Sequence, residues 1–194
     1  MNHIIVEDKL RDTNPVPVVI AFTPNYFIPA STCLYSIFAS LDIEEQIHVI
    51  CLLSEELPDR LKQKIQLIGG ERAQYSFINL QGRLQNIYID AKYTEAASYR
   101  LLLPDLLPEY DKVMYIDCDI IVRNNLVKLY RSVDLGNNYL AAVFEAPMDF
   151  QLGHLKVIGC HPDEYVNSGF LIMNLELMRR DNMVEKFIDA SKAD

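Results

Sequence analysis

Two acidic residues, Asp117 and Asp119, interrupt an apolar run that extends from Val113 to Val122. Burying an unpaired carboxylate is costly, so an acidic pair inside a strand-like run requires a compensating partner. In an extended segment, side chains two residues apart point to the same side, and both carboxylates can then reach one cation. Such hard oxygen ligands suit Mg2+ or Mn2+. The pair therefore predicts a divalent metal site; the competing interpretation is that Asp119 caps a turn and Asp117 faces solvent.

Other residues with suitable chemistry follow predicted strands or lie in a predicted helix. Thr23-Pro24-Asn25-Tyr26 comes directly after the apolar run 18–22, and ligands of open parallel sheets bind beyond the carboxyl ends of strands. Tyr26 could stack on a base and Asn25 could hydrogen-bond to it, although both are also ordinary turn-formers. The planar fork of Arg100 could clamp a diphosphate or a sugar, or make a structural ion pair.

The elements that must position these residues follow from hydrophobic spacing. Short apolar runs predict strands at 18–22, 47–53, 73–78, 113–122, 139–144 and 170–173. Helical spacing predicts helices over 30–41, 57–68, 94–103 (stopped by Pro104), 126–133 and 183–188, with Asn174 as a helix cap. Right-handed strand–helix–strand crossovers then give a mostly parallel sheet. We expect an N-terminal arm at 1–15, a single domain at 16–194, a loop at 79–95 and irregular structure at 147–166.

Composition and motifs narrow the class of ligand. The net charge of −9 argues against a nucleic-acid-binding surface, which needs clustered basic residues. The glycine signatures of phosphate loops, G-x-G-x-x-G and G-x-x-x-x-G-K, are missing, so a nucleotide would be held differently. His154, Cys160 and His161 lack the compact spacing of a zinc site, which we disfavour.

Cysteine usage and apolar runs bear on the compartment. None of the four cysteines forms C-x-x-C, and each has apolar neighbours, so we expect reduced, mostly buried thiols. The start lacks the pattern of a signal peptide, and no apolar run approaches the length of a membrane span. A cytoplasmic protein is therefore predicted, with contact at the inner face of a membrane and self-association into a homo-oligomer left open.

Three segments together resemble glycosyltransferase family 8, whose members include galactosyl- and glucosyltransferases of the lipopolysaccharide type and glycogenin-like proteins. They are AFTPNYFIPASTCLYSIFAS (21–40), TEAASYRLLLPDLLPEYDKVMYIDCDIIVRNNLVKLY (94–130, with the D-x-D motif) and YVNSGFLIMNLELMRR (165–180). The resemblance covers roughly residues 16–190. It implies a GT-A fold: a Rossmann-like α/β/α sandwich around a mostly parallel sheet.

The resemblance also implies an activity and a set of roles. The activity is metal-dependent transfer of a hexose, with retained configuration, from a UDP-sugar such as UDP-glucose or UDP-galactose to a saccharide such as lipopolysaccharide or a cell-surface glycan. Asp117 and Asp119 would bind Mn2+ or Mg2+. The residues implied to contact the nucleotide sugar are Ala21, Phe22, Thr23, Asn25, Tyr26, Arg100, Asp117, Cys118 and Asp119. Glu145, Asn167 and Arg100 would act at the donor sugar and the acceptor.

Departures from the family's pattern leave alternatives open. The loop carries Thr23 and Pro24 where an acid is common in the family. A third metal ligand, the His of an H-x-G-x-x-K-P-W-like segment, does not occur in these 194 residues. We therefore expect the family's C-terminal part, and any membrane contact it makes, to be missing. One alternative is a catalytically incomplete nucleotide-sugar-binding module. Another is a phosphotransferase of the haloacid dehalogenase type, although the mid-chain position of the acidic pair disfavours it.

Overall fold

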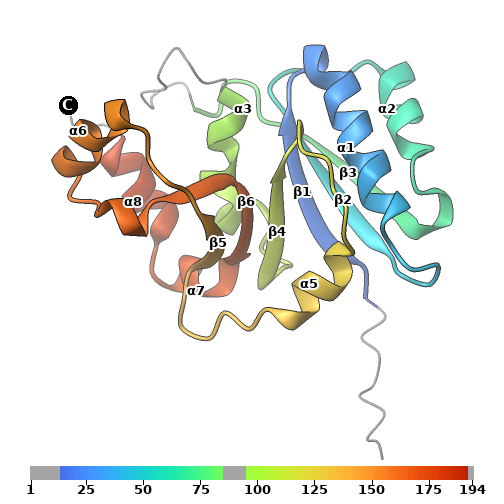
Figure 1. The fold of residues 1–194 in the computed structure, drawn as a ribbon. Coiled ribbons are helices and arrows are strands. Elements are labelled where there is room, and N and C mark those ends of the chain that lie inside the picture. The colour runs from blue at the N-terminus through green and yellow to red at the C-terminus, as the bar shows by residue number, and fades with distance from the viewer. Residues whose placement is uncertain (1–13, 85–94, 192–194) are drawn as a thin grey trace, which may run out of the picture.

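The computed structural model describes residues 14–84 and 95–191 (Figure 1). Within these residues six strands form one sheet in the order β3-β2-β1-β4-β6-β5. The strands are β1 (Val16–Phe22), β2 (Ile47–Leu53), β3 (Ala73–Asn79), β4 (Lys112–Asp117), β5 (Leu140–Phe144) and β6 (Val166–Asn174). The α-helices are α1 (Phe27–Ala39), α2 (Asp59–Gln66), α3 (Glu95–Ser98), α4 (Leu103–Leu106), α5 (Leu126–Ser132), α6 (Asp149–Val157), α7 (Leu175–Arg180) and α8 (Met183–Ala190). The 3-10 helices are η1 (Pro24–Tyr26), η2 (Gly70–Arg72), η3 (Tyr99–Leu102) and η4 (Pro162–Glu164).

Strand direction decides which loops meet at one end of the sheet. β1 pairs in parallel with β2 and with β4, and β2 pairs in parallel with β3. β6 is antiparallel to both β4 and β5, so β5 runs in the same direction as β4. The beginning of β6 therefore lies at the same end of the sheet as the carboxyl ends of β1, β4 and β5. This end of the sheet is at the top of the view in Figure 1.

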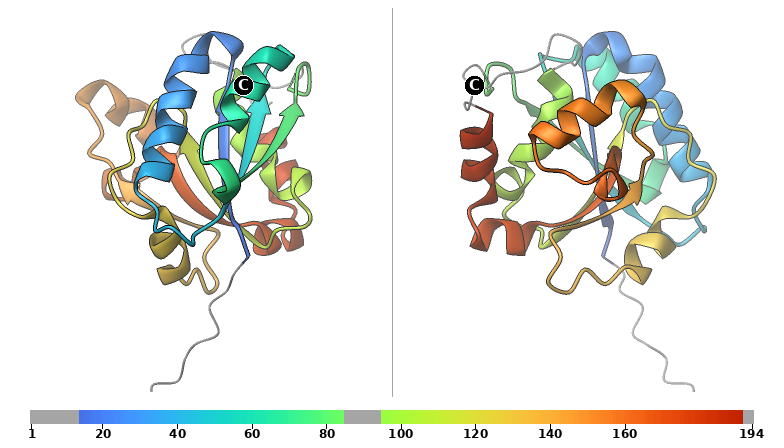
Figure 2. Two further views of the ribbon diagram at one scale, coloured as in Figure 1. Left: turned by 90° about the vertical axis from the view of Figure 1, so that its right-hand side faces the viewer. Right: turned by 60° about the vertical axis from the view of Figure 1, so that its left-hand side comes forward.

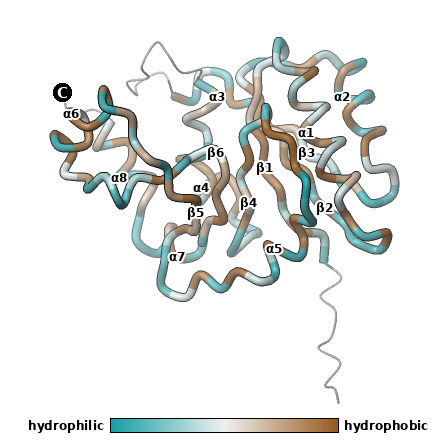
Figure 3. Tube along the Cα trace, viewed as in Figure 1, coloured by the Kyte–Doolittle hydropathy of each residue, from teal (hydrophilic) through white to brown (hydrophobic). Residues whose placement is uncertain are grey.

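Helices cover both faces of the sheet, which gives the expected α/β/α sandwich (Figures 1 and 2). Alternate residues of β1 face opposite cores: Val18 and Ile20 pack with α1, α2 and α5, whereas Val19 packs with α3, η3, α4 and α7. Because both faces are covered, β1 is an uninterrupted apolar strand, as parallel strands usually are. Figure 3, which is coloured by residue hydropathy, shows this apolar character in brown along the central strands.

The region from 147 to 166, expected to be irregular, contains two short helices. α6 and η4 lie there, and β6 begins at Val166, four residues before the predicted strand. α6 has little separation of apolar and polar faces, so its sequence carries a weak helical period. Spacing alone therefore could not locate it.

Two other predicted boundaries were wrong. The helix expected to stop at Pro104 continues as η3 and then α4, because Pro104 lies in the first turn of α4, where a missing backbone N–H is tolerated. The acidic strand ends at Asp117 and a turn follows, so the apolar residues up to Val122 are not strand. The predicted cap was correct: the Asn174 side chain accepts a hydrogen bond from the Leu177 N–H.

Some predictions fall outside the described residues. Most of the N-terminal arm and residues 85–94 of the predicted loop lie there. Within the described parts of the chain, no helix combines the length and the apolar character that crossing a bilayer requires.

Candidate active site

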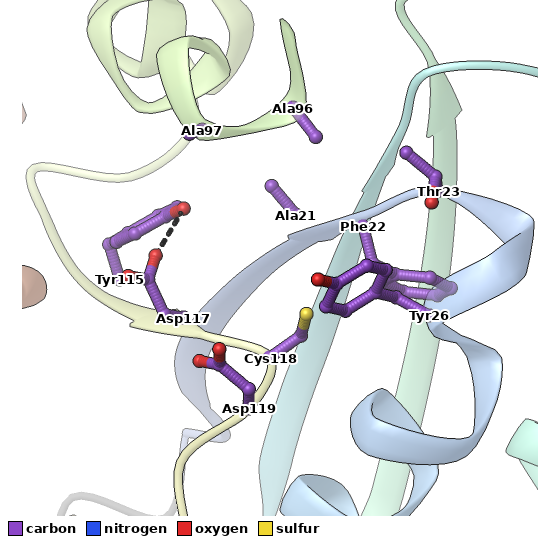
Figure 4. Close-up of a pocket in the computed structure, with 10 residues that line it drawn as sticks. All are labelled: Ala21, Phe22, Thr23, Tyr26, Ala96, Ala97, Tyr115, Asp117, Cys118 and Asp119. Carbon is purple, nitrogen blue, oxygen red and sulfur yellow. Dashed lines mark hydrogen bonds between the residues drawn. The ribbon is translucent and has the colours of Figure 1, made fainter. Parts of the chain in front are cut away.

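A cavity of about 300 Å3 lies where β1 and β4 end side by side, a volume within the range of small-molecule sites. The pairing register places Ala21, near the end of β1, opposite Asp117, the last residue of β4. η1 follows β1 and supplies one wall, and α3 supplies another (Figure 4). The cavity is lined by Ala21, Phe22, Thr23, Tyr26, Ala96, Ala97, Tyr115, Asp117, Cys118 and Asp119.

The carboxylate of Asp117 is held by Tyr115 and Arg100. The Tyr115 hydroxyl donates a hydrogen bond of 3.0 Å to Asp117 Oδ1, drawn in Figure 4. A guanidinium nitrogen of Arg100 lies 3.7 Å from the same oxygen. The Arg100 guanidinium also lies over the Tyr115 ring, with Cζ 4.6 Å from the ring centroid, a cation–π arrangement. Burial raises the pKa of Tyr115 above its ordinary value, so the phenol remains a neutral donor at physiological pH.

Arg100 joins the helical wall of the site to β6. Its Nε donates to the Ala97 carbonyl at 2.6 Å, and a terminal nitrogen donates to the Ser168 carbonyl. Its side chain is 12% exposed, against 39% for Asp117. Arg100 is therefore a largely buried, fixed positive charge directly behind the carboxylate, where it offsets the cost of burying that charge.

The first residues of β6 contact the residue that follows β5. The Asn167 side chain accepts from the Gly169 N–H at 2.8 Å and donates to Glu145 Oε2 at 3.1 Å. Glu145 directly follows β5. Because β5 and β4 run in the same direction, Glu145 lies at the same end of the sheet as Asp117, as expected. Neither Glu145 nor Asn167 is among the residues that line the cavity.

The two acids reach the same cavity by a route that differs from the expected one. Asp117 ends β4, and Cys118 and Asp119 form a turn, so the argument from alternation along an extended strand was wrong. Figure 4 shows the Asp117 carboxylate at the end of β4 and the Asp119 carboxylate on the turn that follows. Cys118 between them is buried, which raises the pKa of its thiol to about 12. Mn2+ and Mg2+ prefer oxygen ligands to sulfur, which leaves the carboxylates as the donors.

The chemistry of these donors fits a hard divalent cation held partly by other oxygen ligands. Two carboxylates line one cavity, and such oxygens suit Mn2+ or Mg2+. Among the residues that the structure describes, no group of three or more His, Cys, Asp or Glu side chains is arranged to hold a metal ion. A cation there would therefore need ligands from a phosphate group or water, as Mg2+ commonly does.

The structure brings most of the predicted site residues together. Seven line the cavity: Ala21, Phe22, Thr23, Tyr26, Asp117, Cys118 and Asp119. Arg100 contacts Asp117 from behind, whereas Asn25 is exposed and outside the lining. Sequence reasoning missed Tyr115, Ala96, Ala97, Ser168 and Gly169. Tyr115 could have been found, because it lies two residues before Asp117 on the same side of a strand.

A sequence profile described as "Glycosyl transferase family 8" matches residues 17–194. General stress protein A of Bacillus subtilis is 25% identical over 183 residues, covering 93% of this chain and 63% of that protein. Glycosyltransferase GlyE of Streptococcus pneumoniae is 31% identical over 115 residues, covering 56% of this chain and 28% of that protein. The chain thus spans less than two thirds of either relative.

Solved structures share the fold. The galactosyltransferase LgtC, crystallised with donor and acceptor sugar analogues, superposes with a TM-score of 0.73 at 26% identity, covering 91% of this chain and 65% of that one. The bifunctional glycosyltransferase WbbM superposes with a TM-score of 0.77 at 23% identity, covering 100% of this chain and 36% of that one. These likenesses confirm the expected GT-A fold.

Proposed function

Because the chain belongs to glycosyltransferase family 8, we propose that it transfers a hexose from a UDP-sugar to a saccharide acceptor with retention of configuration. UDP-glucose and UDP-galactose are the proposed donors, and lipopolysaccharide or a cell-surface glycan the proposed acceptor. One observation carries the proposal: Asp117 and Asp119 line the same cavity as Thr23 and Tyr26. Carboxylates for a metal–diphosphate group and an aromatic ring for a base thus share one volume.

The loop after β1 is suited to the nucleoside. Tyr26 is 45% exposed beside the cavity, so its ring is accessible for stacking, a contact worth roughly 1–3 kcal/mol per base. Thr23 adds a hydroxyl, and the small side chain of Ala21 leaves room between β1 and the acidic turn. Asn25 lies outside the lining, so we assign it no contact with the nucleotide.

Asp117 and Asp119 are the residues that would hold Mn2+ or Mg2+. Such an ion, when bound, supplies positive charge that stabilises a departing diphosphate. Arg100 contributes a fixed charge behind Asp117 and keeps that carboxylate oriented. Its contacts with Ala97 and Ser168 make its orientation independent of the substrate.

A front-side substitution fits the residues at the site. The bond between the anomeric carbon and the diphosphate oxygen breaks, the acceptor oxygen bonds to the same face of the carbon, and the hydroxyl proton passes to the departing diphosphate. Of the side chains that line the cavity, the carboxylates are Asp117 and Asp119, both assigned to the metal. Glu145 is hydrogen-bonded to Asn167. A covalent glycosyl adduct trapped with a fluorinated donor, on Glu145 or on any other residue, would contradict this route.

A second candidate is a nucleotide-sugar-binding module without turnover. The observation that favours it is the absence of a three-residue ligand group among the described residues. The family assignment gives no support to a haloacid dehalogenase-type phosphotransferase.

A donor panel distinguishes these functions. UDP-glucose, UDP-galactose and GDP-mannose are incubated with the chain and either Mn2+ or EDTA, and free sugar and transfer to a saccharide are measured. Mn2+-dependent release or transfer from a UDP-hexose supports the transferase. Mn2+-dependent UDP binding without release or transfer supports the binding module. Activity on phosphate monoesters without nucleotide binding would contradict both.

A further inference from the structure

We propose that Ser36 on α1 is a positioning residue for the turn that carries Asp119. This inference rests on the proposed function, because it concerns how the chain prepares its metal site. The starting point is the end of β4 at Asp117, after which residues 118–125 have no helix or strand of their own. Backbone groups in such a segment need partners from elsewhere in the molecule.

α1 and its C-cap residue Ser40 contact the end of β4 and two backbone groups of this segment. The Ser36 hydroxyl accepts a hydrogen bond from the Val122 N–H at 2.9 Å. The Cys33 thiol lies 3.9 Å from the Asp117 carbonyl oxygen, as a weak donor, and the Ser40 hydroxyl donates to the Asn124 carbonyl at 3.1 Å. Residues three and four apart share one helix face, so Cys33, Ser36 and Ser40 meet the segment in sequence order.

Ser36 holds the segment that follows the turn at Val122, whereas the Cys33 thiol contacts the backbone of Ile120. Its hydroxyl donates to the Cys33 carbonyl at 2.7 Å while accepting from the Val122 N–H. This double role fixes the hydroxyl direction, because its one proton is committed to the helix. Val122 is three residues after Asp119, so the anchor limits where the turn can place that carboxylate.

The expected consequence is selective for the metal. Asp117 is held independently by Tyr115 and Arg100, so loss of the Ser36 contact leaves it in place. Asp119 depends on the turn. Replacing Ser36 with Ala removes the partner of the Val122 N–H, and we expect Mn2+ affinity to fall by about tenfold, the lower range for losing a supporting group around a metal ligand.

The chain offers a matched control and a rescue variant. Ser31 lies on the same helix, and its hydroxyl donates to the Phe27 carbonyl at 2.7 Å. Ser31→Ala therefore removes an equivalent helix hydrogen bond away from the turn. Ser36→Thr keeps a hydroxyl that can still bond to the preceding turn of the helix.

Two readouts test the proposal in wild type, Ser36→Ala, Ser36→Thr and Ser31→Ala, with thermal melting to verify folding. The first is amide hydrogen exchange at Val122 without ligand, which we expect to be about tenfold faster in Ser36→Ala and unchanged in the other two. The second is Mn2+ affinity at saturating UDP, measured by electron paramagnetic resonance. We expect it to be about tenfold weaker in Ser36→Ala and unchanged in Ser36→Thr and Ser31→Ala.

The possible failures are distinguishable. If wild type binds Mn2+ with UDP and Ser36→Ala keeps both that affinity and the slow Val122 exchange, the role of Ser36 is overturned and the proposed function stands. Equal losses in Ser31→Ala, or in Ser36→Thr, overturn it as well, since the effect would then reflect helix stability or side-chain shape. If wild type shows no Mn2+-dependent UDP binding, the proposed function fails and this inference fails with it.

Discussion

Gly169 on β6 lies so close to Asp117 that a Cβ atom there would be 2.6 Å from Asp117 Oδ2. No side chain is accommodated at that separation unless the carboxylate moves. The requirement for glycine comes from this close approach, since Gly169 is not among the glycines with positive φ. Gly169→Ala is therefore expected to displace Asp117 and weaken Mn2+–UDP binding by about tenfold or more, measured by calorimetry.

Gly153 on α6 is the matched control for that substitution. A Cβ there would meet nothing within 4 Å, and Gly→Ala in a helix is usually neutral or stabilising. Gly153→Ala should retain Mn2+–UDP affinity. An unchanged affinity in Gly169→Ala would show that the position of Asp117 is unimportant for binding.

Tyr115→Phe isolates the hydrogen bond to Asp117. The substitution removes the hydroxyl that donates to Oδ1 and keeps the ring beneath Arg100. We expect a loss of about 1 kcal/mol in the free energy of unfolding, measured by urea titration, because Asp117 retains Arg100 as a partner. A substitution that leaves both stability and Mn2+–UDP affinity unchanged would contradict the role assigned to this hydroxyl.

The fold was largely predictable because its central strands are recognisable in the sequence. The runs at 18–22 and 47–53 are continuous apolar segments, the pattern of strands buried on both faces. α6 was not predictable, because its sequence lacks a clear apolar face. The end of β4 was also missed: Ile120 and Val122 are apolar, but they pack on the core from the irregular segment after the turn.

Site residues that belong to one recognisable segment could be predicted from the sequence. Contacts between segments that are distant in the sequence could not. Asp117 and Asp119 are recognisable as acids inside an apolar run. The contact of Ser168 with Arg100 joins residues 68 apart in the sequence, and no local pattern encodes it. The predicted geometry of the acidic pair was wrong for the same reason, because contacts from α1, which is distant in the sequence, shape the turn.

His48 gives the fold a pH dependence. Its ring nitrogens bond to the hydroxyls of Tyr110 and Ser76, linking β2 to β3 and to the segment before β4. Burial lowers the pKa of His48 below its ordinary value of 6.5, an effect that the Glu109 carboxylate partly opposes. The unfolded chain then binds the proton more tightly than the folded chain. The stability that neutral His48 contributes is therefore fully present above pH 6.5, and it is lost as the pH falls from 6.5 through the lower pKa of the folded state.

The measurement is the melting temperature at about pH 7.5 and about pH 5.5. The decrease between the two should be smaller in His48→Asn than in wild type. His161→Asn, at an exposed position, should retain the wild-type decrease. An identical decrease in all three proteins would show that His48 does not contribute.

The cysteines should differ in reactivity. Cys33, Cys51 and Cys118 are buried, and burial raises the pKa of each thiol, to about 12 for Cys33 and Cys118. Cys160 is partly exposed. Iodoacetamide at about pH 8 should therefore modify Cys160 first in the native chain, with the other three reacting after denaturation. Mass spectrometry that found Cys118 labelled as fast as Cys160 would contradict the buried, neutral state of that thiol.

The most direct test of the proposed site is the affinity for UDP with and without Mn2+ in wild type and in Asp119→Asn, measured by calorimetry. Asp105→Asn, at an exposed position outside the cavity, is the control. We predict that Mn2+ strengthens UDP binding to wild type and to Asp105→Asn, and that Asp119→Asn loses at least about tenfold of the Mn2+-dependent affinity. Equal UDP affinity with and without Mn2+ in wild type, or a Mn2+ effect that survives intact in Asp119→Asn, would contradict the metal–nucleotide site.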